Sequence, residues 1–306
     1  MDIDTNYGRL YNCRNIAYHK NGHVAECICQ NKSLIRLNNL TLLPYYTENE
    51  RRKLSPSIKF YPDGTLKSVY LEKQVSINTP LGLTAAELIT FYPDGGLCRV
   101  FPLNGKISAY WSEDREINLL GKMTFPLSVG TFTTRPMCFH FYKNGHLKSL
   151  TLQSTERITI NTPVGHLKIK CGFSLYKDGQ LCSAEPASAQ KLLTPIGHLT
   201  CCDPNSIGLS ADSGSLIFTE SGALQQLKTI DIINIIDSGN CRHSFVPDRI
   251  PNPLNENALL TLPLTVNFSI NTITIEKNTA EKFTFPLHSC QFIINNMQND
   301  PTIKNI

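Results

Sequence analysis

The sequence lacks several features that would assign it to a common class of protein. It contains no run of about 18 apolar residues, so no membrane-spanning helix and no membrane partner are expected. Its first residues, Met1 to Asp4, include neither a basic stretch nor an apolar stretch of the kind found in signal peptides. These observations predict a cytoplasmic protein.

Positive charge is also weakly concentrated. The formal net charge of the 306 residues is only +4, and the densest basic cluster, Arg51 to Lys53, stands beside Glu48 and Glu50. A nucleic-acid-binding protein needs a focused basic surface to neutralise phosphates. We therefore expect no nucleic-acid partner.

Nucleotide-binding loops and an export pattern are missing as well. The glycines form neither a Gly-x4-Gly-Lys-Ser/Thr nor a Gly-x-Gly-x-x-Gly motif, so no cofactor is predicted. The eleven cysteines are odd in number, in a large chain without an export signal. Reduced cytosolic thiols are the better interpretation.

A short motif recurs along the chain and determines the fold prediction. It combines an aromatic pair, a turn of the Pro-Asp-Gly or Lys-Asn-Gly kind, and a leucine two residues later. The glycine-to-glycine interval in the regular units is roughly 31 to 34 residues. The copies are Tyr18–Val24, Phe60–Leu66, Phe91–Leu97, Phe141–Leu147, Leu175–Leu181 and the more divergent Phe218–Leu224.

The residue types at the centre of this motif predict a β-hairpin with a three-residue loop. Proline presets φ, Asp or Asn tolerates the next position, and glycine supplies the left-handed residue that closes the loop. This geometry places Phe60 opposite Leu66 and Tyr61 opposite Thr65. By simple alternation, Val69 and Leu71 then project to the face opposite Phe60 and Leu66, leaving apolar residues on both faces.

A second motif, Thr-Pro-x-Gly, follows the turns. It occurs at Thr79–Gly82, Thr162–Gly165 and Thr194–Gly197, with a stretched copy at 125–130. Because a central strand does not tolerate proline, we predict corners or edges at these positions.

The turn pattern resembles the Tyr-x-Asn/Asp-Gly-x-Leu core of bacterial antitoxin-like, MORN-related hairpin-repeat proteins. The resemblance covers about residues 15–225. It implies a tandem-hairpin fold and an immunity or antitoxin-like role with a protein partner.

The predicted fold class is all-β, with tandem antiparallel hairpins forming an elongated twisted sheet or a solenoid-like array. We expect a repeat domain at 1–225 and a C-terminal β cap with a polar tail at 226–306. The cap includes strands within Leu259–Ile275 and Lys282–Ile294, and the tail follows Asn296. Short helices are possible only at 47–54, 84–88 and 185–192.

The best candidate site is an insertion. The interval from Gly95 to Gly130 is about 35 residues, against about 18 in the regular units, and the extra length spans residues 102–116. It holds the single tryptophan, and Tyr, Trp and Arg are typical anchors of protein interfaces. The predicted binding residues are Tyr110, Trp111, Glu113, Asp114, Arg115 and Glu116.

Two further functions remain open for this chain. One is an enzyme in which Glu113, Asp114, Glu116 and Tyr110 form the site, joined to His140 or His146 across a pocket. Alternatively, the same residues form only an additional hairpin, with the tryptophan in the core and no functional site. The other is a small-molecule or metal carrier that uses its cysteines and histidines.

The cysteine and histidine patterns do not predict a metal site or a nucleophile. His19, His23, Cys27 and Cys29 offer zinc-binding groups, as do Cys138, His140 and His146, but neither spacing is that of a closed zinc site. Cys201, Cys202 and Asp203 follow His198, yet buried cysteine usually packs as a small hydrophobe. We therefore predict no metal ligand and no catalytic residue.

Overall fold

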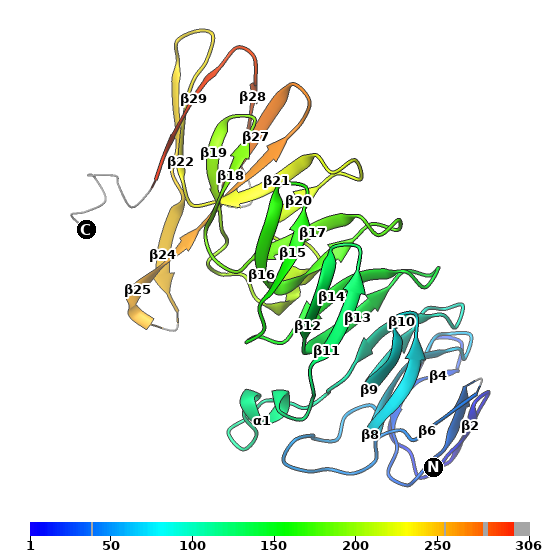
Figure 1. Ribbon diagram of the computed structural model, residues 1–306. Coiled ribbons are helices and arrows are strands. Elements are labelled where there is room, and N and C mark those ends of the chain that lie inside the picture. Colours follow the sequence, from blue (N-terminus) through cyan, green and yellow to red (C-terminus); the bar gives the residue numbers. More distant parts are fainter. Residues whose placement is uncertain (38, 254, 278–280, 297–306) are drawn as a thin grey trace. The chain divides into compact units, whose positions relative to one another are not determined.

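A computed structural model describes residues 1–37, 39–253, 255–277 and 281–296. Within these ranges the protein consists mainly of strands and turns, and most of its antiparallel strand pairs join strands that are consecutive in sequence (Figure 1). The helical segments there are α1 (Glu113–Ile117) and a 3-10 turn (Gly208–Ala211). The predicted all-β class is confirmed.

The chain divides into two compact units. The first comprises residues 1–125 and 133–153, and the second comprises residues 126–132 and 154–306. The predicted boundary at residue 225 lies inside the second unit. There β21 (Leu224–Thr229) pairs on one side with β20 (Leu216–Phe218) and on the other with β26 (Leu264–Phe268).

The first unit is built around one antiparallel sheet, coloured blue to green in Figure 1. Two small hairpins accompany it, β1 (Ile3–Thr5) with β2 (Gly8–Leu10) and β5 (Ile35–Leu37) with β6 (Leu40–Leu42). The sheet strands, in spatial order, are β3 (Arg14–Tyr18), β4 (Val24–Ile28), β7 (Ile58–Phe60), β8 (Leu66–Thr79), β9 (Gly82–Phe91), β10 (Leu97–Phe101), β13 (Pro136–Phe141) and β14 (Leu147–Leu152).

The second unit repeats the design and adds smaller sheets. Strands occur in both predicted C-terminal segments, and the tail after Asn296 lies outside the described residues. The main strands are β15 (Ile158–Thr162), β16 (Gly165–Leu175), β17 (Leu181–Pro186), β20, β21, β26, β27 (Thr272–Lys277) and β28 (Glu281–Pro286). The others are β18 (Gln190–Thr194), β19 (Gly197–Cys201), β22 (Ile232–Ile236), β23 (Arg242–Phe245), β24 (Asp248–Asn252), β25 (Asn255–Leu262) and β29 (Gln291–Asn295), with β11 (Met123–Leu127) and β12 (Gly130–Thr134) earlier in the chain.

The recurring turns share one hydrogen-bond pattern. In the second copy, the amide of Tyr61 donates to the carbonyl of Thr65 at 2.8 Å and the amide of Gly64 donates to the carbonyl of Tyr61 at 2.9 Å. The carboxylate of Asp63 accepts the amide of Thr65 at 2.8 Å. The turn glycines of all six copies have φ between 80° and 88°, the left-handed region that favours glycine. The predicted three-residue loop is confirmed.

A β-bulge follows every one of these turns. Because of it, Val69 and Leu71 do not lie on the face of the sheet that was predicted for them. Phe60 pairs with Leu66, and Ile58 pairs with Val69, so one extra residue, Lys67, stands between them. The bulge moves Val69 and Leu71 onto the same buried face as Leu66, instead of the opposite face. The equivalent bulge residues in the other copies are Ala25, Cys98, Lys148, Cys182 and Gln225.

The Thr-Pro-x-Gly motif makes a second hairpin turn, so the predicted corner is wrong. Thr79 pairs with Gly82, and only Pro80 and Leu81 connect β8 to β9. The hydroxyl of Thr79 donates to the carbonyl of Gly82 at 2.8 Å and accepts the amide of Leu81. Proline is tolerated because its turn position needs no ladder amide. The same arrangement occurs at Thr5–Gly8, Thr162–Gly165 and Thr194–Gly197.

Successive hairpins are joined by a ladder of aromatic side chains. The hydroxyl of Tyr61 donates to the carbonyl of Phe91 at 2.8 Å, and that of Tyr92 donates to the carbonyl of Phe141 at 2.7 Å. In the second unit, Tyr176 reaches the carbonyl of Phe218 at 2.6 Å in the same way. The first copy has His19 at this position, with Nε2 at 3.0 Å from the carbonyl of Phe60. Each side chain therefore links one hairpin to the next.

Three segments expected to be capable of helix formation are not helical. Residues 47–54 are irregular, residues 84–88 belong to β9, and residues 185–192 cover the end of β17 and the start of β18. In the last two segments, strand pairing overrides the local helix propensity. In the described part of the chain, no helix has the length and apolar character needed to span a membrane.

The ladder generates a stability prediction. Replacing Tyr61 or Tyr92 by Phe removes one hydrogen bond between hairpins and should lower the free energy of unfolding by about 1 kcal/mol. Urea denaturation followed by circular dichroism measures the change. The matched control is Tyr11→Phe, at a tyrosine that is exposed. Equal midpoints for the ladder and control variants would contradict a stabilising role of these hydroxyls.

Candidate functional site

The insertion between β10 and β11 forms a compact loop that contains α1. The side chain of Ser112 caps this helix by accepting the amide of Arg115. The amide of Ser108 donates to the carbonyl of Trp111 at 2.9 Å, which closes the preceding turn. Local hydrogen bonds therefore define the conformation of residues 108–118.

A buried ion-pair network attaches this loop to the sheet. Arg51 lies between two glutamates: its Nη2 is 2.6 Å from Oε2 of Glu87, and its Nε is 2.6 Å from Oε2 of Glu116. The three side chains are 11%, 5% and 9% exposed, respectively. Burial alone raises the pKa of Glu116, but hydrogen bonds from Arg51, Gly105 and Trp111 outweigh it, so the net pKa is lowered.

Backbone groups complete the network. The amide of Gly105 donates to Oε1 of Glu116 at 2.7 Å, and the amide of Asn104 donates to Oε2 of Glu87 at 2.8 Å. A Cβ at position 105 would come within 2.1 Å of the Glu116 carboxylate. Glycine is needed at 105 because the carboxylate approaches the backbone so closely.

The predicted binding residues separate into an inner and an outer group. Glu116 is buried, and Trp111 is partly buried and donates its indole N–H to Glu116 at 2.7 Å. Tyr110 is 75% exposed. The guanidinium of Arg115 stacks over the Trp111 ring at 4.3 Å and donates to the carbonyl of Tyr110. Glu113, Asp114 and Arg115 are exposed, so the inner residues hold the outer ones in place.

Most of the basic cluster at Arg51 to Lys53 makes contacts inside the protein. Arg52 is buried, lies over the ring of Tyr45 at 4.8 Å and donates to the carbonyls of Leu71 and Glu72. Two of its three cationic side chains thus have internal partners.

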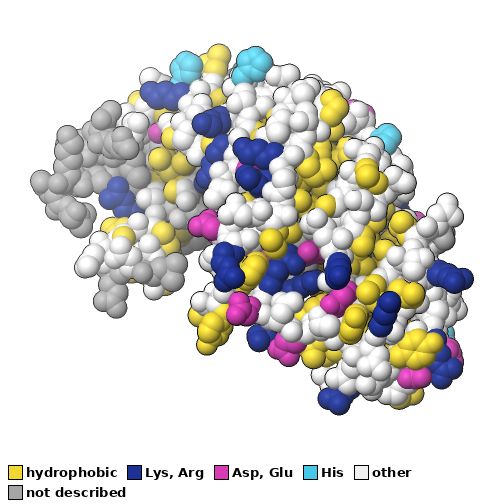
Figure 2. Space-filling view, turned by 60° about the horizontal axis from the view of Figure 1, so that its bottom comes forward, with side chains coloured by type: hydrophobic (Ala, Val, Ile, Leu, Met, Phe, Trp, Pro, Cys, Tyr) yellow, Lys and Arg dark blue, Asp and Glu magenta, His cyan; other side chains and the backbone are white. Residues whose placement is uncertain are grey.

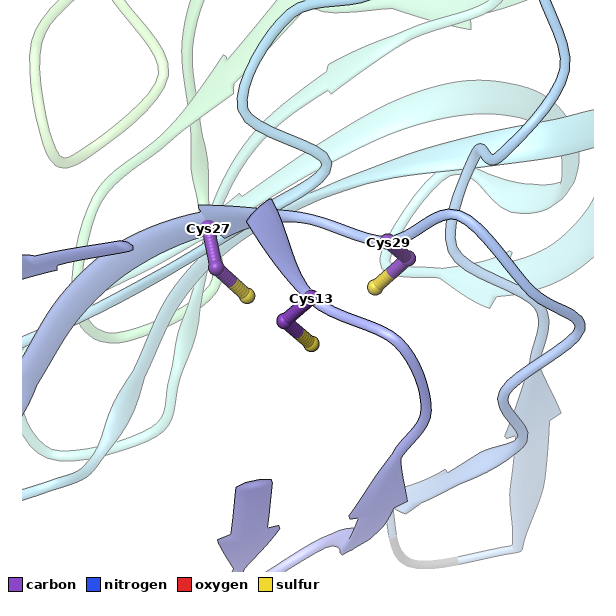
Figure 3. A group of neighbouring side chains, drawn as sticks. All are labelled: Cys13, Cys27 and Cys29. Atoms are coloured by element: carbon purple, nitrogen blue, oxygen red, sulfur yellow. The ribbon is translucent and has the colours of Figure 1, made fainter. Parts of the chain in front are cut away.

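The candidate zinc ligands of the first hairpin point to different surroundings. His19 and His23 contact the backbone carbonyls of Phe60 and Pro62. Cys27 and Cys29 are buried and meet a third thiol, Cys13, which sequence analysis did not connect with them. Figure 3 shows the three sulfur atoms side by side. Cys13 lies in the connection between β2 and β3, so only the folded topology reveals this neighbour.

His140 also has an unexpected cysteine neighbour. Its predicted companions were Cys138 and His146, but its side chain interacts with the thiol of Cys98, the bulge residue of the third hairpin. Burial raises the pKa of the Cys98 thiol, but the interaction with His140 acts in the opposite sense and the net pKa lies below the usual value. This is a thiol–imidazole pair at a partly exposed position.

Cys201 and Cys202 of the second unit have the opposite character. Burial raises the pKa of both Cys201 and Cys202, which keeps these thiols protonated. His198 is exposed whereas Cys201 is buried, and Asp203 forms an ion pair with Lys228 at 2.7 Å. The segment is therefore not arranged as a Cys–His–Asp nucleophile.

A fully buried carboxyl group, Glu185, lies near these cysteines and was not singled out from the sequence. Burial raises its pKa, and the hydroxyl of Ser215 donates to both of its oxygens, at 2.9 and 2.7 Å. A raised pKa favours the neutral acid in this apolar setting. Its neighbours Ala184 and Pro186 are buried as well, so the strand shows no alternation in burial here that would single out position 185.

Comparisons with models of protein families, with curated protein sequences and with solved structures found no match to this chain. The hairpin geometry and the side-chain clusters described above are therefore the basis for functional inference.

The ion-pair network generates a second stability prediction. Arg51→Met leaves two buried carboxylates without their cation and should cost about 3–5 kcal/mol in the free energy of unfolding, measured by urea denaturation. The control, Arg9→Met, breaks exposed ion pairs with Asp2 and Asp4 and should cost at most about 1 kcal/mol. Adding Glu87→Gln to Arg51→Met should restore part of the loss. If the two single variants were equally stable, the network would not anchor the loop.

The Cys98–His140 pair generates a pH-dependent prediction. Because its pKa is lowered, the thiolate persists to a lower pH than in an unperturbed cysteine, and alkylation by iodoacetamide should remain fast there. In a His140→Gln variant, the pH of half-maximal alkylation at Cys98 should rise. Peptide mapping by mass spectrometry follows this single site. Superimposable pH profiles for the two proteins would show that His140 does not activate the thiol.

Proposed function

We propose that this chain is a non-enzymatic hairpin-repeat protein that binds another protein through the insertion at 102–116. The observation that carries the proposal is that the insertion combines a buried part, which fixes its conformation, with an exposed part. Buried Glu116, held by Arg51, fixes a loop whose outer side chains are exposed, Tyr110 above all.

The fixed loop lowers the entropic cost of binding. An exposed tyrosine normally loses side-chain and loop freedom when a partner covers it, and a loop ordered in advance avoids part of that loss. The carbonyl of Tyr110 already accepts a hydrogen bond from Arg115 at 2.8 Å. Tyrosine and arginine are enriched among the residues that dominate interface energetics.

The charges around Tyr110 indicate which surface a partner would present. Glu113 and Asp114 occupy the first turn of α1 and are exposed, with Glu50 3.9 Å from Arg115. Acidic groups at the rim of an interface attract a surface that carries Lys or Arg and speed the encounter. Figure 2 shows one face of the protein, on which apolar side chains are interspersed with Lys, Arg, Asp and Glu.

The resemblance to antitoxin-like, MORN-related hairpin-repeat proteins supports a protein partner and suggests an immunity or antitoxin-like role. The proposal includes the cytoplasm as the compartment, because an odd number of cysteines in a large chain is typical of reduced thiols. An enzyme built on Glu113, Asp114 and Glu116 is less well supported, because the Glu116 carboxylate already accepts hydrogen bonds from Arg51, Gly105 and Trp111.

The test starts from tagged full-length protein, recovered gently from its own host under reducing conditions and examined by native mass spectrometry. A second polypeptide in the complex identifies the partner. Tyr110→Ala should then weaken the measured Kd by at least about tenfold, or about 1.4 kcal/mol, because tyrosine is enriched among the few residues that dominate an interface.

The control is Tyr11→Ala, which removes another exposed tyrosine outside the insertion. Circular dichroism checks that both variants keep the native fold. Recovery of the bare chain, or a Kd that Tyr110→Ala leaves unchanged, would count against binding through this loop.

A further inference from the structure

The strongest additional feature is the group of three thiols in the first unit. The Sγ atoms of Cys13, Cys27 and Cys29 all lie within 4.8 Å of one another. The three residues are 3%, 0% and 0% exposed. Among the residues that the structure describes, no other three His, Cys, Asp or Glu side chains bring their ligand atoms this close together.

The backbone holds the three cysteines firmly. The amide of Cys13 donates to the carbonyl of Met1 at 2.7 Å. The carbonyl of Cys27 accepts the amide of Ser57 at 2.8 Å, and the amide of Cys29 donates to the Ser57 hydroxyl at 3.1 Å. Cys27 and Cys29 are two residues apart along one extended segment, so their side chains share a face. Main-chain hydrogen bonds therefore fix the cluster, although only Cys27 lies within a strand.

The spacing of the sulfur atoms fits a shared metal ion. Thiolates bound to one zinc ion at about 2.3 Å lie roughly 4 Å apart, close to the separations that the cluster permits. A disulfide would join two of the sulfurs and leave the third beside it. Figure 3 shows the three sulfur atoms gathered in one place, which suits a common ligand better than a single pair.

The electrostatics of the cluster favour a bound cation. Three thiolates this close together and this deeply buried would repel one another. A cation supplies the positive charge that allows all three to ionise away from water, with release of their protons.

We propose that Cys13, Cys27 and Cys29 bind one thiophilic d10 cation, Cu⁺ or Zn²⁺, in a closed structural site at the N-terminal edge of the first sheet. Soft thiolate ligands select these two ions. Three sulfurs complete a trigonal site for Cu⁺, whereas Zn²⁺ would take a further ligand. Either ion would attach the connection between β2 and β3 to β4.

The experiment uses the full chain, reduced and freed of metal, with Zn²⁺ and Cu⁺ titrated separately against competing chromophoric chelators under anaerobic conditions. One equivalent of at least one ion should bind to the metal-free protein. Cys13→Ser and Cys27→Ser should each weaken binding at least tenfold. Cys201→Ser, which alters a buried thiol of the second unit, should leave the affinity unchanged.

A second measurement covers variants that fail to fold. In the unaltered protein, the metal should slow iodoacetamide modification of the three clustered cysteines at least tenfold, without protecting the exposed Cys241. Hydrogen exchange should also slow in residues 1–30 when the metal is added. Three results would overturn the proposal: no stoichiometric binding of either ion, binding that survives a combined Cys13→Ser and Cys27→Ser substitution, or a disulfide within the cluster in protein alkylated directly on lysis.

Discussion

The hydrogen bond from one hairpin's tyrosine to the next hairpin's backbone is the interaction on which the remaining structure depends. An isolated two-stranded hairpin is only marginally stable in water, so each unit needs its neighbour. Tyr61 and Tyr92 reach carbonyls that are separated from them by quite different lengths of chain, 30 and 49 residues. The spatial contact is the same although the intervening sequence differs. The array therefore accepts insertions between hairpins without losing its register.

The bulge after each turn brings the apolar residues on either side of it onto the same buried face. Without it, strict alternation would place Val69 opposite Leu66, and half of the apolar residues would face water. One extra residue per hairpin restores them to the core, and its own side chain is then released to the other face. Lysine uses that freedom at positions 67 and 148, where the ammonium lies over a tyrosine ring. At position 98 the same place holds a cysteine, which meets His140 instead.

Much of the fold could be predicted from the sequence, because turn chemistry is local. Asp63 and Gly64 determine their loop with little help from the rest of the chain, and the pairing of Phe60 with Leu66 follows directly. The bulges and the two-residue Thr79–Gly82 turn were not predicted, because they depend on how the strands pair, which residue type alone does not indicate. The site was harder to foresee. The insertion is visible as extra length, but nothing near Glu116 in sequence indicates that Arg51 is its partner, 65 residues away.

The thiol cluster is a second group of neighbouring side chains that sequence spacing does not indicate. Its spacing, with Cys13 well before the Cys27–Cys29 pair, matches no zinc knuckle, and sequence analysis accordingly predicted no ligand there. A sheet, however, gathers ligands by strand pairing and by alternation, neither of which requires a fixed interval along the chain. Cys27 and Cys29 share a face because they are two residues apart, and the return of the chain from β2 brings Cys13 beside them. Spacing rules derived from knuckles and helices therefore do not reveal a cluster of this kind, because topology rather than sequence distance brings the three thiols together.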